Sequence, residues 1–134
     1  MPGEIELPRP ATMSDFQKYI HALEEMHGWL DVDLIHNGFL LAEELGELIK
    51  AIRKHEKYYE SSGGAARDAE TTCEHVAEEL VDVFNYLCAI ANRLDIDIEA
   101  AFRKKNARNQ RRTWGPSHRP EDPHRPEDPH RPKD

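Results

Sequence analysis

The chain has 134 residues, a formal net charge of −8 at pH 7 and a mean hydropathy of −0.81. This acidic balance argues against a stable nucleic-acid partner, because proteins that bind nucleic acids present a basic surface. No apolar run in the sequence approaches the roughly 20 residues that span a bilayer. The N-terminus lacks the basic start and apolar stretch of a signal peptide. We therefore expect a soluble, cytoplasmic protein with no membrane partner.

The two cysteines agree with a reducing compartment. Cys73 and Cys88 lie 15 residues apart in one predicted helix, which corresponds to about 22 Å and is too far for a disulfide. Neither belongs to a CxxC pair, so a zinc site is not indicated. We interpret both as buried, reduced side chains.

An irregular N-terminal arm over residues 1–12 precedes four predicted helices. Ser14 and Gln17 fit a capping box that begins the first helix, which should end near Gly28. No stretch alternates with the period of a strand, so the fold class is all-α, a four- to five-helix bundle within a domain over residues 13–115. In chain order, the predicted helices cover about 14–28, 35–58, 69–93 and 98–112, and the breaks between them include SSGGAARD (61–68) and the polar step at 95–97.

The second and third predicted helices each carry two acids three residues apart, a spacing that places both side chains on one helix face. Glu44 pairs in this way with Glu47, and Glu79 pairs with Asp82. A helical wheel places each pair beside an apolar seam, and antiparallel packing of the seams would bring all four carboxylates together. The predicted seams are Leu41, Leu45, Leu48 and Ile52 in one helix, and Val76, Leu80, Phe84, Leu87 and Ala91 in the other.

Four converging carboxylates repel one another and raise each other's pKa unless a cation compensates them. Mg²⁺ suits such a site, with Mn²⁺ as a substitute ion, because hard divalent cations prefer oxygen ligands and complete their shell with substrate phosphates. The alternative is an ordinary charged helix surface, since 33% of the chain is charged. His75 shares the acid-bearing stripe, as a neighbour of the ligands or as an ordinary exposed histidine.

Two segments, EELGELIKAI (43–52) and EELVDVFNYLCAIANRLDID (78–97), resemble the two halves of the MazG-type nucleotide pyrophosphohydrolase signature. The closing stretch KNARNQRRTW (105–114) is similar to the family's K-x-x-x-N-x-x-R element. The likeness covers about residues 35–114. It implies an all-α, Mg²⁺-dependent enzyme that hydrolyses nucleoside triphosphates to the monophosphate and pyrophosphate, with a role in clearing the nucleotide pool.

The same resemblance assigns roles to individual residues. The metal ligands would be Glu44, Glu47, Glu79 and Asp82, and Glu43 would be a further catalytic acid that binds metal or activates water. Because the wheel turns Glu43 toward solvent, that role would need a neighbouring subunit or a local distortion. The residues expected to face phosphates are Lys105, Asn109 and Arg112, with Lys50 and Arg53 as weaker candidates.

Three residues before or at the start of the second helix, Trp29, His36 and Asn37, are candidates for a base pocket. Apolar side chains off the main seams would then be buried by a second copy in a homodimer or homotetramer. These are Ile49, Cys88, Ile90 and Leu94.

Two other functions fit parts of the sequence. From residue 116 the chain is of low complexity, and HRPEDP begins at His118 and again at His124, which is typical of a disordered tail. An acidic helical module could display that tail to a partner without any catalysis. A di-iron protein of the ferritin type needs two ExxH motifs on helices, whereas within the predicted helices only Glu24-x-x-His27 fits.

Overall fold

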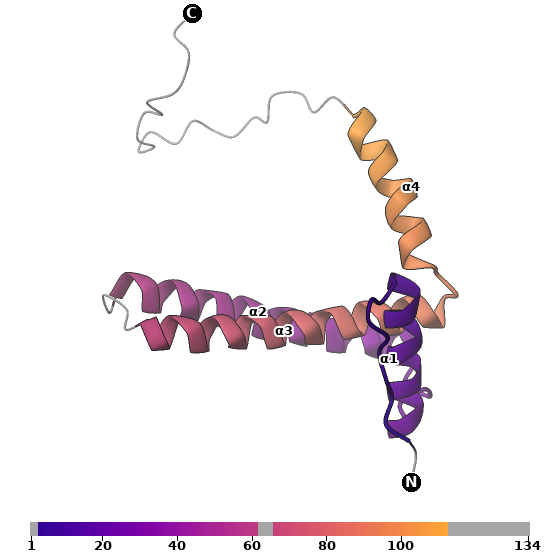
Figure 1. Cartoon of the computed structure of the whole chain (residues 1–134), viewed down its shortest axis with the longest axis horizontal. Coiled ribbons are helices and arrows are strands. Elements are labelled where there is room, and N and C mark those ends of the chain that lie inside the picture. Colours follow the sequence, from indigo (N-terminus) through magenta and orange to yellow (C-terminus); the bar gives the residue numbers. More distant parts are fainter. Residues whose placement is uncertain (1–2, 62–65, 113–134) are drawn as a thin grey trace, which may run out of the picture.

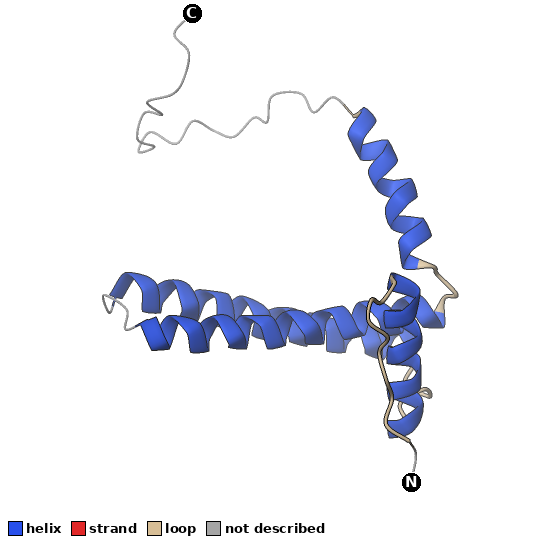
Figure 2. Ribbon diagram, viewed as in Figure 1, coloured by secondary structure: helices blue, strands red, loops and turns tan. Residues whose placement is uncertain are grey.

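A computed structural model describes residues 3–61 and 66–112 of the chain (Figure 1). Among these residues all regular structure is helical, which confirms the predicted all-α class (Figure 2). The helices are α1 (Met13–His27), α2 (Leu34–Ser61), α3 (Ala66–Arg93) and α4 (Ile98–Arg111). None of them is long and apolar enough to cross a membrane. The centre of the predicted break and the predicted tail at residues 116–134 lie outside the described residues.

The helices α2 and α3 form a long antiparallel hairpin, and α1 lies across the end of the hairpin that is far from its turn (Figure 1). A small core joins α1 to α3 through Ile20, Cys88 and Ala89. Partly buried apolar residues surround this core, namely Tyr19, Leu23, Phe84 and Ile98. The fourth helix contacts α1 at its beginning and then projects away from the hairpin, so the four helices do not close into a compact bundle.

The N-cap of the first helix lies two residues earlier than predicted. Thr12 is the N-cap, and its hydroxyl accepts a hydrogen bond from the Asp15 backbone N–H at 3.2 Å. The Asp15 carboxylate accepts one in return from the Thr12 backbone N–H at 2.8 Å. The capping box therefore consists of Thr12 and Asp15, and the assignment to Ser14 and Gln17 was wrong.

Gln17 instead fastens α1 to the connection between α3 and α4. Its side-chain amide donates to the Ile96 carbonyl at 2.8 Å and accepts from the Ile98 backbone N–H at 3.0 Å. Asn92 completes the link by donating to the Gln17 carbonyl at 2.8 Å. Asp97, the last residue of the predicted break at 95–97, caps α4, because its side chain accepts a hydrogen bond from the Ala100 backbone N–H.

The hairpin packs through only part of the predicted seam, together with residues beside it. On α2, Leu48 and Ala51 are buried, whereas the seam residues Leu45 and Ile52 are exposed. The row that contains Leu48 and Ala51 also contains Glu44, as their spacing on a helix requires. A carboxylate therefore lies in the helix–helix contact, in the same row as the seam residue Leu48.

An apolar face remains uncovered on one side of the hairpin. We use this term for Leu45, Ile49, Ile52, Leu80 and Leu87, all of which are exposed. Leu45 and Leu80 each directly follow a packed glutamate, and in an antiparallel pair of helices such following residues turn to the same side. The acids Glu47 and Asp82 turn to the opposite side by the same geometry.

The two cysteines differ. Cys88 is fully buried in the core, and burial raises the pKa of its thiol to about 11. Cys73 is exposed, so the prediction that it is buried was wrong: α1 covers only the C-terminal part of α3, and Cys73 lies beyond that cover. Because Cys88 is covered within its own chain, it is also not available to a second copy, unlike Ile49 and Leu94, which are exposed.

Candidate metal site and adjoining cavity

Three of the four predicted metal ligands come together where α2 passes α3. One carboxylate oxygen from each of Glu44, Glu79 and Asp82 lies within 4.8 Å of the others. The antiparallel packing places Glu44 opposite the two acids of α3, which are themselves one helical turn apart. Glu44 and Glu79 are partly buried in the contact, and Asp82 is exposed at its edge.

The cluster perturbs the ionisation of Glu44. Burial raises the pKa of Glu44 above its ordinary value, and the negative charges of Asp82 and Glu79 raise it further. Glu43 and Glu47 add smaller contributions in the same direction. The carboxylates thus act on one another as a group of like charges, which is the situation that a bound cation relieves.

The fourth predicted ligand lies outside this group. Glu47 is half-exposed on α2, and its carboxylate lies 3.6 Å from the Lys50 ammonium. Glu43 is exposed, as the helical wheel predicts. His75 lies beside the cluster, with Nε2 at 3.5 Å from Glu79 and Nδ1 at 3.6 Å from Glu78.

The donor set suits a hard divalent cation. Three carboxylates from two helices supply oxygen ligands only, which favours Mg²⁺, Mn²⁺ or Ca²⁺ over the softer ions that select sulfur or imidazole. The exposed side chain of Asp82 leaves the cluster open to solvent on one side. A cation held there would keep positions free for water or for phosphate oxygens.

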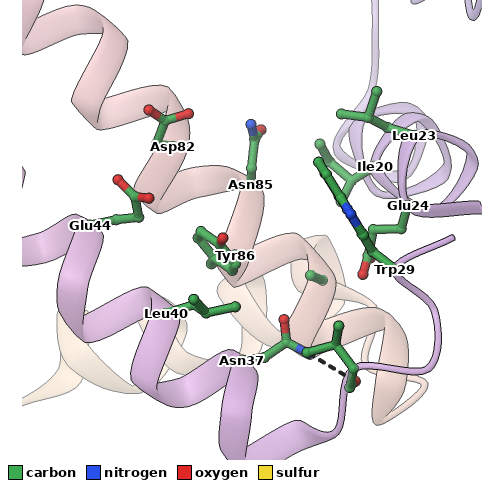
Figure 3. A pocket seen from close by; sticks show the side chains of 12 residues that line it. Ile20, Leu23, Glu24, Trp29, Asn37, Leu40, Glu44, Asp82, Asn85 and Tyr86 are labelled. Atoms are coloured by element: carbon green, nitrogen blue, oxygen red, sulfur yellow. Dashed lines mark hydrogen bonds between the residues drawn. The ribbon is translucent and has the colours of Figure 1, made fainter. Parts of the chain in front are cut away.

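A cavity of about 430 Å³ adjoins the cluster and is shared by α1, α2 and α3. Glu44 and Asp82 lie at one end, whereas Glu24 and Trp29 lie at the other (Figure 3). The apolar side chains that line it are Ile20, Leu23, Val32, Leu40 and Ala89, and the polar side chains of Tyr86 and Asn85 line it as well. The cavity is thus acidic at the end that meets the cluster and largely apolar along its walls.

Two of the three residues predicted for a base pocket line this cavity. Trp29 is 51% exposed, and its ring stacks on His27 with the ring centroids 4.4 Å apart. Asn37 is buried, and its side-chain N–H group donates to the carbonyls of Val32 at 3.2 Å and Asp33 at 3.1 Å. His36 does not line the cavity: it is exposed on the neighbouring helix face, beside Phe39.

Tyr86 presents its hydroxyl between the two ends of the cavity (Figure 3). Burial raises the pKa of this phenol, and the charges of Glu44 and Asp82 raise it further. Tyr86 therefore remains protonated at neutral pH and offers a hydroxyl that both donates and accepts a hydrogen bond.

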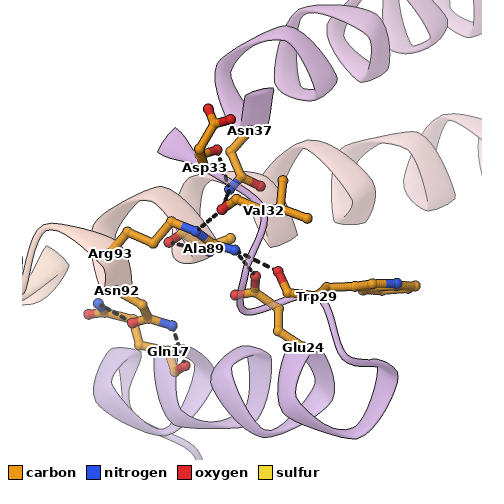
Figure 4. A network of polar contacts seen from close by, with 9 residues as sticks. All are labelled: Gln17, Glu24, Trp29, Val32, Asp33, Asn37, Ala89, Asn92 and Arg93. Carbon is orange, nitrogen blue, oxygen red and sulfur yellow. Dashed lines mark hydrogen bonds and ion pairs between the residues drawn. The ribbon is translucent and has the colours of Figure 1, made fainter. Parts of the chain in front are cut away.

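The segment between α1 and α2 is held by Arg93 at the end of α3 (Figure 4). Its guanidinium donates to the Val32 carbonyl at 2.8 Å and to the Trp29 carbonyl at 3.0 Å. The same group forms an ion pair with Glu24 of α1 at 2.7 Å. Gly28 lets the chain turn into this segment, because it adopts a left-handed conformation with φ of 71°. One side chain thus fixes the backbone beneath the Trp29 wall of the cavity.

The residues expected to contact phosphates are not brought to the acids within this chain. Lys105, Asn109 and Arg112 belong to α4 or its C-cap, which projects away from the hairpin (Figure 1). Lys50 and Arg53 are exposed on α2, and Lys50 is paired with Glu47. Within the described residues, the α4 side chains therefore stay apart from the acid cluster.

Sequence reasoning missed the contribution of Glu24 and Arg93. Glu24 was noted only within an ExxH pattern, yet it pairs with Arg93, and His27 of that pattern stacks on Trp29 instead. The available signal was an acid in the apolar stripe of an amphipathic helix, because such a residue needs a buried partner.

Comparison with known proteins agrees with this arrangement. Residues 36–114 match the family model of the MazG nucleotide pyrophosphohydrolase domain. The matched span includes all three clustered acids and all of α4. No curated protein and no solved structure matches the chain.

Proposed function

Because the chain belongs to the MazG nucleotide pyrophosphohydrolase domain family, we propose that it hydrolyses nucleoside or deoxynucleoside triphosphates to the monophosphate and pyrophosphate. The single observation that carries this proposal is the cluster of Glu44, Glu79 and Asp82, whose oxygens lie within 4.8 Å of one another beside a cavity. A triphosphate of about −4 charge would be repelled by bare carboxylates, so the reaction depends on Mg²⁺.

In this proposal Glu44, Glu79 and Asp82 hold Mg²⁺, and Glu47 joins them as a fourth ligand after leaving Lys50. The bound ion supplies charge neutralisation for the phosphates and acidity for an attacking water. The helix contact supports the role of the carboxylates, because it fixes Glu44 and Glu79 before substrate arrives and no ordering is needed later. Mn²⁺ is expected to replace Mg²⁺, since it accepts the same oxygen ligands.

The two ends of the cavity determine the orientation in which the nucleotide would bind. Its acidic end receives the phosphates through the cation, so the base extends between the apolar walls toward Trp29. Trp29 offers an aromatic face for stacking, and Tyr86 offers a neutral hydroxyl on the way. Asn37, locked by two backbone carbonyls, presents a fixed amide to the same space.

The remaining predicted residues require a second copy. We propose a homodimer or homotetramer in which the apolar face is buried and the α4 residues Lys105, Asn109 and Arg112 reach the phosphates of a neighbouring site. Glu43, exposed in one chain, would take part at such an interface. The exposure of Leu45, Ile49, Ile52, Leu80 and Leu87 supports this assembly, because apolar patches of this kind on a hairpin mark a contact surface.

A nucleotide panel tests the proposal. Standard and modified nucleoside and deoxynucleoside triphosphates are incubated with Mg²⁺, and pyrophosphate and monophosphate are measured separately. Equal amounts of the two products, formed only with the divalent ion, are expected from at least one substrate. If no nucleotide releases pyrophosphate, the enzyme proposal is wrong and the non-enzymatic interaction module is favoured.

A further inference from the structure

One buried carboxylate oxygen in the cavity wall has no partner. Glu24 is only 6% exposed, and its Oε2 atom is held by Arg93 at 2.7 Å. Among the described residues, its Oε1 atom finds no hydrogen-bond partner. A buried polar atom without a partner is unfavourable in a natural protein and calls for an explanation. The ion pair with Arg93 provides a partner for Oε2, but it leaves Oε1 without one.

Glu24 lines the same cavity as the metal acids, at the end away from them (Figure 3). Under the proposed function, on which this inference rests, the phosphates lie near Glu44 and Asp82. The opposite end then receives the nucleobase. Oε1 is therefore at the position where a polar edge of the base would arrive.

We propose that Glu24 selects nucleobases that carry an exocyclic amino group, by accepting a hydrogen bond from that group at Oε1. An ionised carboxylate can only accept hydrogen bonds. The amino groups of cytosine, adenine and guanine donate to it, whereas the 4-oxo group of uracil or thymine directs lone pairs at it. Binding of an amino-bearing base is favoured because its N–H group gives the buried Oε1 atom a donor. Binding of an oxo base is disfavoured because it places a second acceptor against Oε1.

Asn37 adds a second hydrogen-bond acceptor to the cavity. Its amide N–H group is used by the carbonyls of Val32 and Asp33, so the amide oxygen is the atom left for a ligand. Two acceptors in one cavity, a carboxylate and an amide oxygen, match a base edge that is rich in donors. Glu24 has no donor to offer, and Asn37 could turn its N–H group toward a ligand only by losing the bonds to Val32 and Asp33.

The same proposal assigns a movement to Trp29. Oε1 is covered by protein atoms in this structure, so a base reaches it only when a wall side chain shifts. Trp29 is half-exposed and lies in the segment between two helices, so its ring can move by giving up its stacking on His27 and without unwinding either helix. Its backbone stays in place because Arg93 holds the carbonyl.

The test is a comparison of kcat/KM between bases that differ in the amino group. Deoxycytidine triphosphate is compared with deoxyuridine triphosphate, and the adenine and guanine substrates are compared with the hypoxanthine analogue, which lacks both amino groups. We expect the effect in whichever set, pyrimidine or purine, is hydrolysed faster. There, kcat/KM for the best amino-bearing substrate should exceed kcat/KM for the substrate that lacks the amino group by about 10- to 100-fold, the range for a hydrogen bond to a charged group. A ratio near one or below it in the wild-type protein overturns the inference.

Glu24→Gln tests the cause. Arg93 only donates, so it orients the new amide with its oxygen toward Arg93 and its N–H group toward the Oε1 position. The ratio should therefore fall to about one or invert, whereas Glu25→Gln, an exposed neighbour on α1, should leave it unchanged. If Glu24 had a purely structural role, Glu24→Gln would lower kcat/KM for every substrate by the same factor and leave the ratio unchanged. That result would also overturn the inference.

The two proposals fail in different ways. Absence of pyrophosphate release from every nucleotide rejects the proposed function and with it any role for Glu24 in base selection. Hydrolysis without discrimination between amino and oxo bases rejects only the role of Glu24. If Glu24→Gln does not fold, the wild-type ratio still decides.

Discussion

Arg93 and Glu24 form a buried ion pair that joins the end of α3 to α1, with the guanidinium Nη2 and the carboxylate Oε2 separated by 2.7 Å. Their side chains are 15% and 8% exposed, respectively. The same guanidinium holds the carbonyls of Trp29 and Val32, so the pair also fixes the segment that forms one wall of the cavity (Figure 4). The wall of the proposed base site thus depends on a contact between helices that are far apart in the sequence.

Replacing Arg93 with Met should destabilise the fold by about 3–5 kcal/mol, because it leaves the Glu24 carboxylate buried without its counter-ion. The two carbonyls lose their donor at the same time. Urea denaturation measures the change in the free energy of unfolding. As a control, Arg103→Met removes an exposed ion pair with Glu99 and should change that free energy by less than about 0.5 kcal/mol. Similar values for the two variants would contradict the structural role of Arg93.

The raised pKa of Glu44 predicts a pH dependence in the absence of metal. A group whose pKa is higher in the folded state holds its proton more tightly there, so the free energy of unfolding falls as pH rises through the folded pKa. In wild-type protein treated with a chelator, this contribution is present at acidic pH and is lost toward neutrality. Glu44→Gln should flatten that part of the stability curve between about pH 4.5 and neutrality. A stability curve of unchanged shape in the variant would show that the pKa of Glu44 is not raised in the folded protein.

Mg²⁺ should stabilise the wild-type protein, since a cation that binds only the folded state adds about 2.7 kcal/mol at a concentration 100 times its Kd. Asp82→Asn or Glu47→Gln should raise the melting temperature without metal, because each removes a like charge, and should abolish the gain on adding Mg²⁺. Glu74→Gln, an exposed acid on α3, is the matched control and should keep the gain. Full Mg²⁺ stabilisation in both the Asp82 and the Glu47 variants would remove these residues from the metal site.

The apolar face predicts self-association. At low micromolar concentration, light scattering should give at least twice the 15.5 kDa mass of one chain. Leu80→Glu should dissociate the assembly, since it buries a charge in an apolar contact. Met26→Glu changes an equally large exposed side chain on α1 and should leave the mass unchanged. An active wild-type monomer would overturn the assembly and would require all phosphate contacts to come from one chain.

Helix positions and acid spacing were readable from the sequence because both follow from local periodicity. The three-residue spacing of Glu79 and Asp82 places them on one face of any helix, and the structure brings them to Glu44. The sequence alone did not predict how each helix is rotated about its own axis. Leu45 and Leu48 fit a seam equally well, and only the packing of α2 against α3 decides that Leu48 is buried and Leu45 is exposed.

The other features that the sequence did not predict depend on contacts between segments that are distant in the chain. No local pattern links Glu24 to Arg93, which lie on different helices and meet only through the fold. The role of Gln17 likewise arises from the path of the chain after α3, where Ile96 and Ile98 present backbone groups to it. The direction of α4 depends on the same connection, and for that reason spacing alone could not place Lys105 relative to the acids.

The central claim, that Glu44, Glu79 and Asp82 form a Mg²⁺-dependent site of triphosphate cleavage, is tested most directly by kcat/KM for pyrophosphate release in wild-type protein and Glu44→Gln. With the best substrate of the panel, the variant should lose activity by about 100-fold or more, equivalent to roughly 2.7 kcal/mol in transition-state stabilisation. Glu56→Gln, an exposed acid further along α2, should retain wild-type activity. Undiminished Mg²⁺-dependent pyrophosphate release by Glu44→Gln would contradict the account.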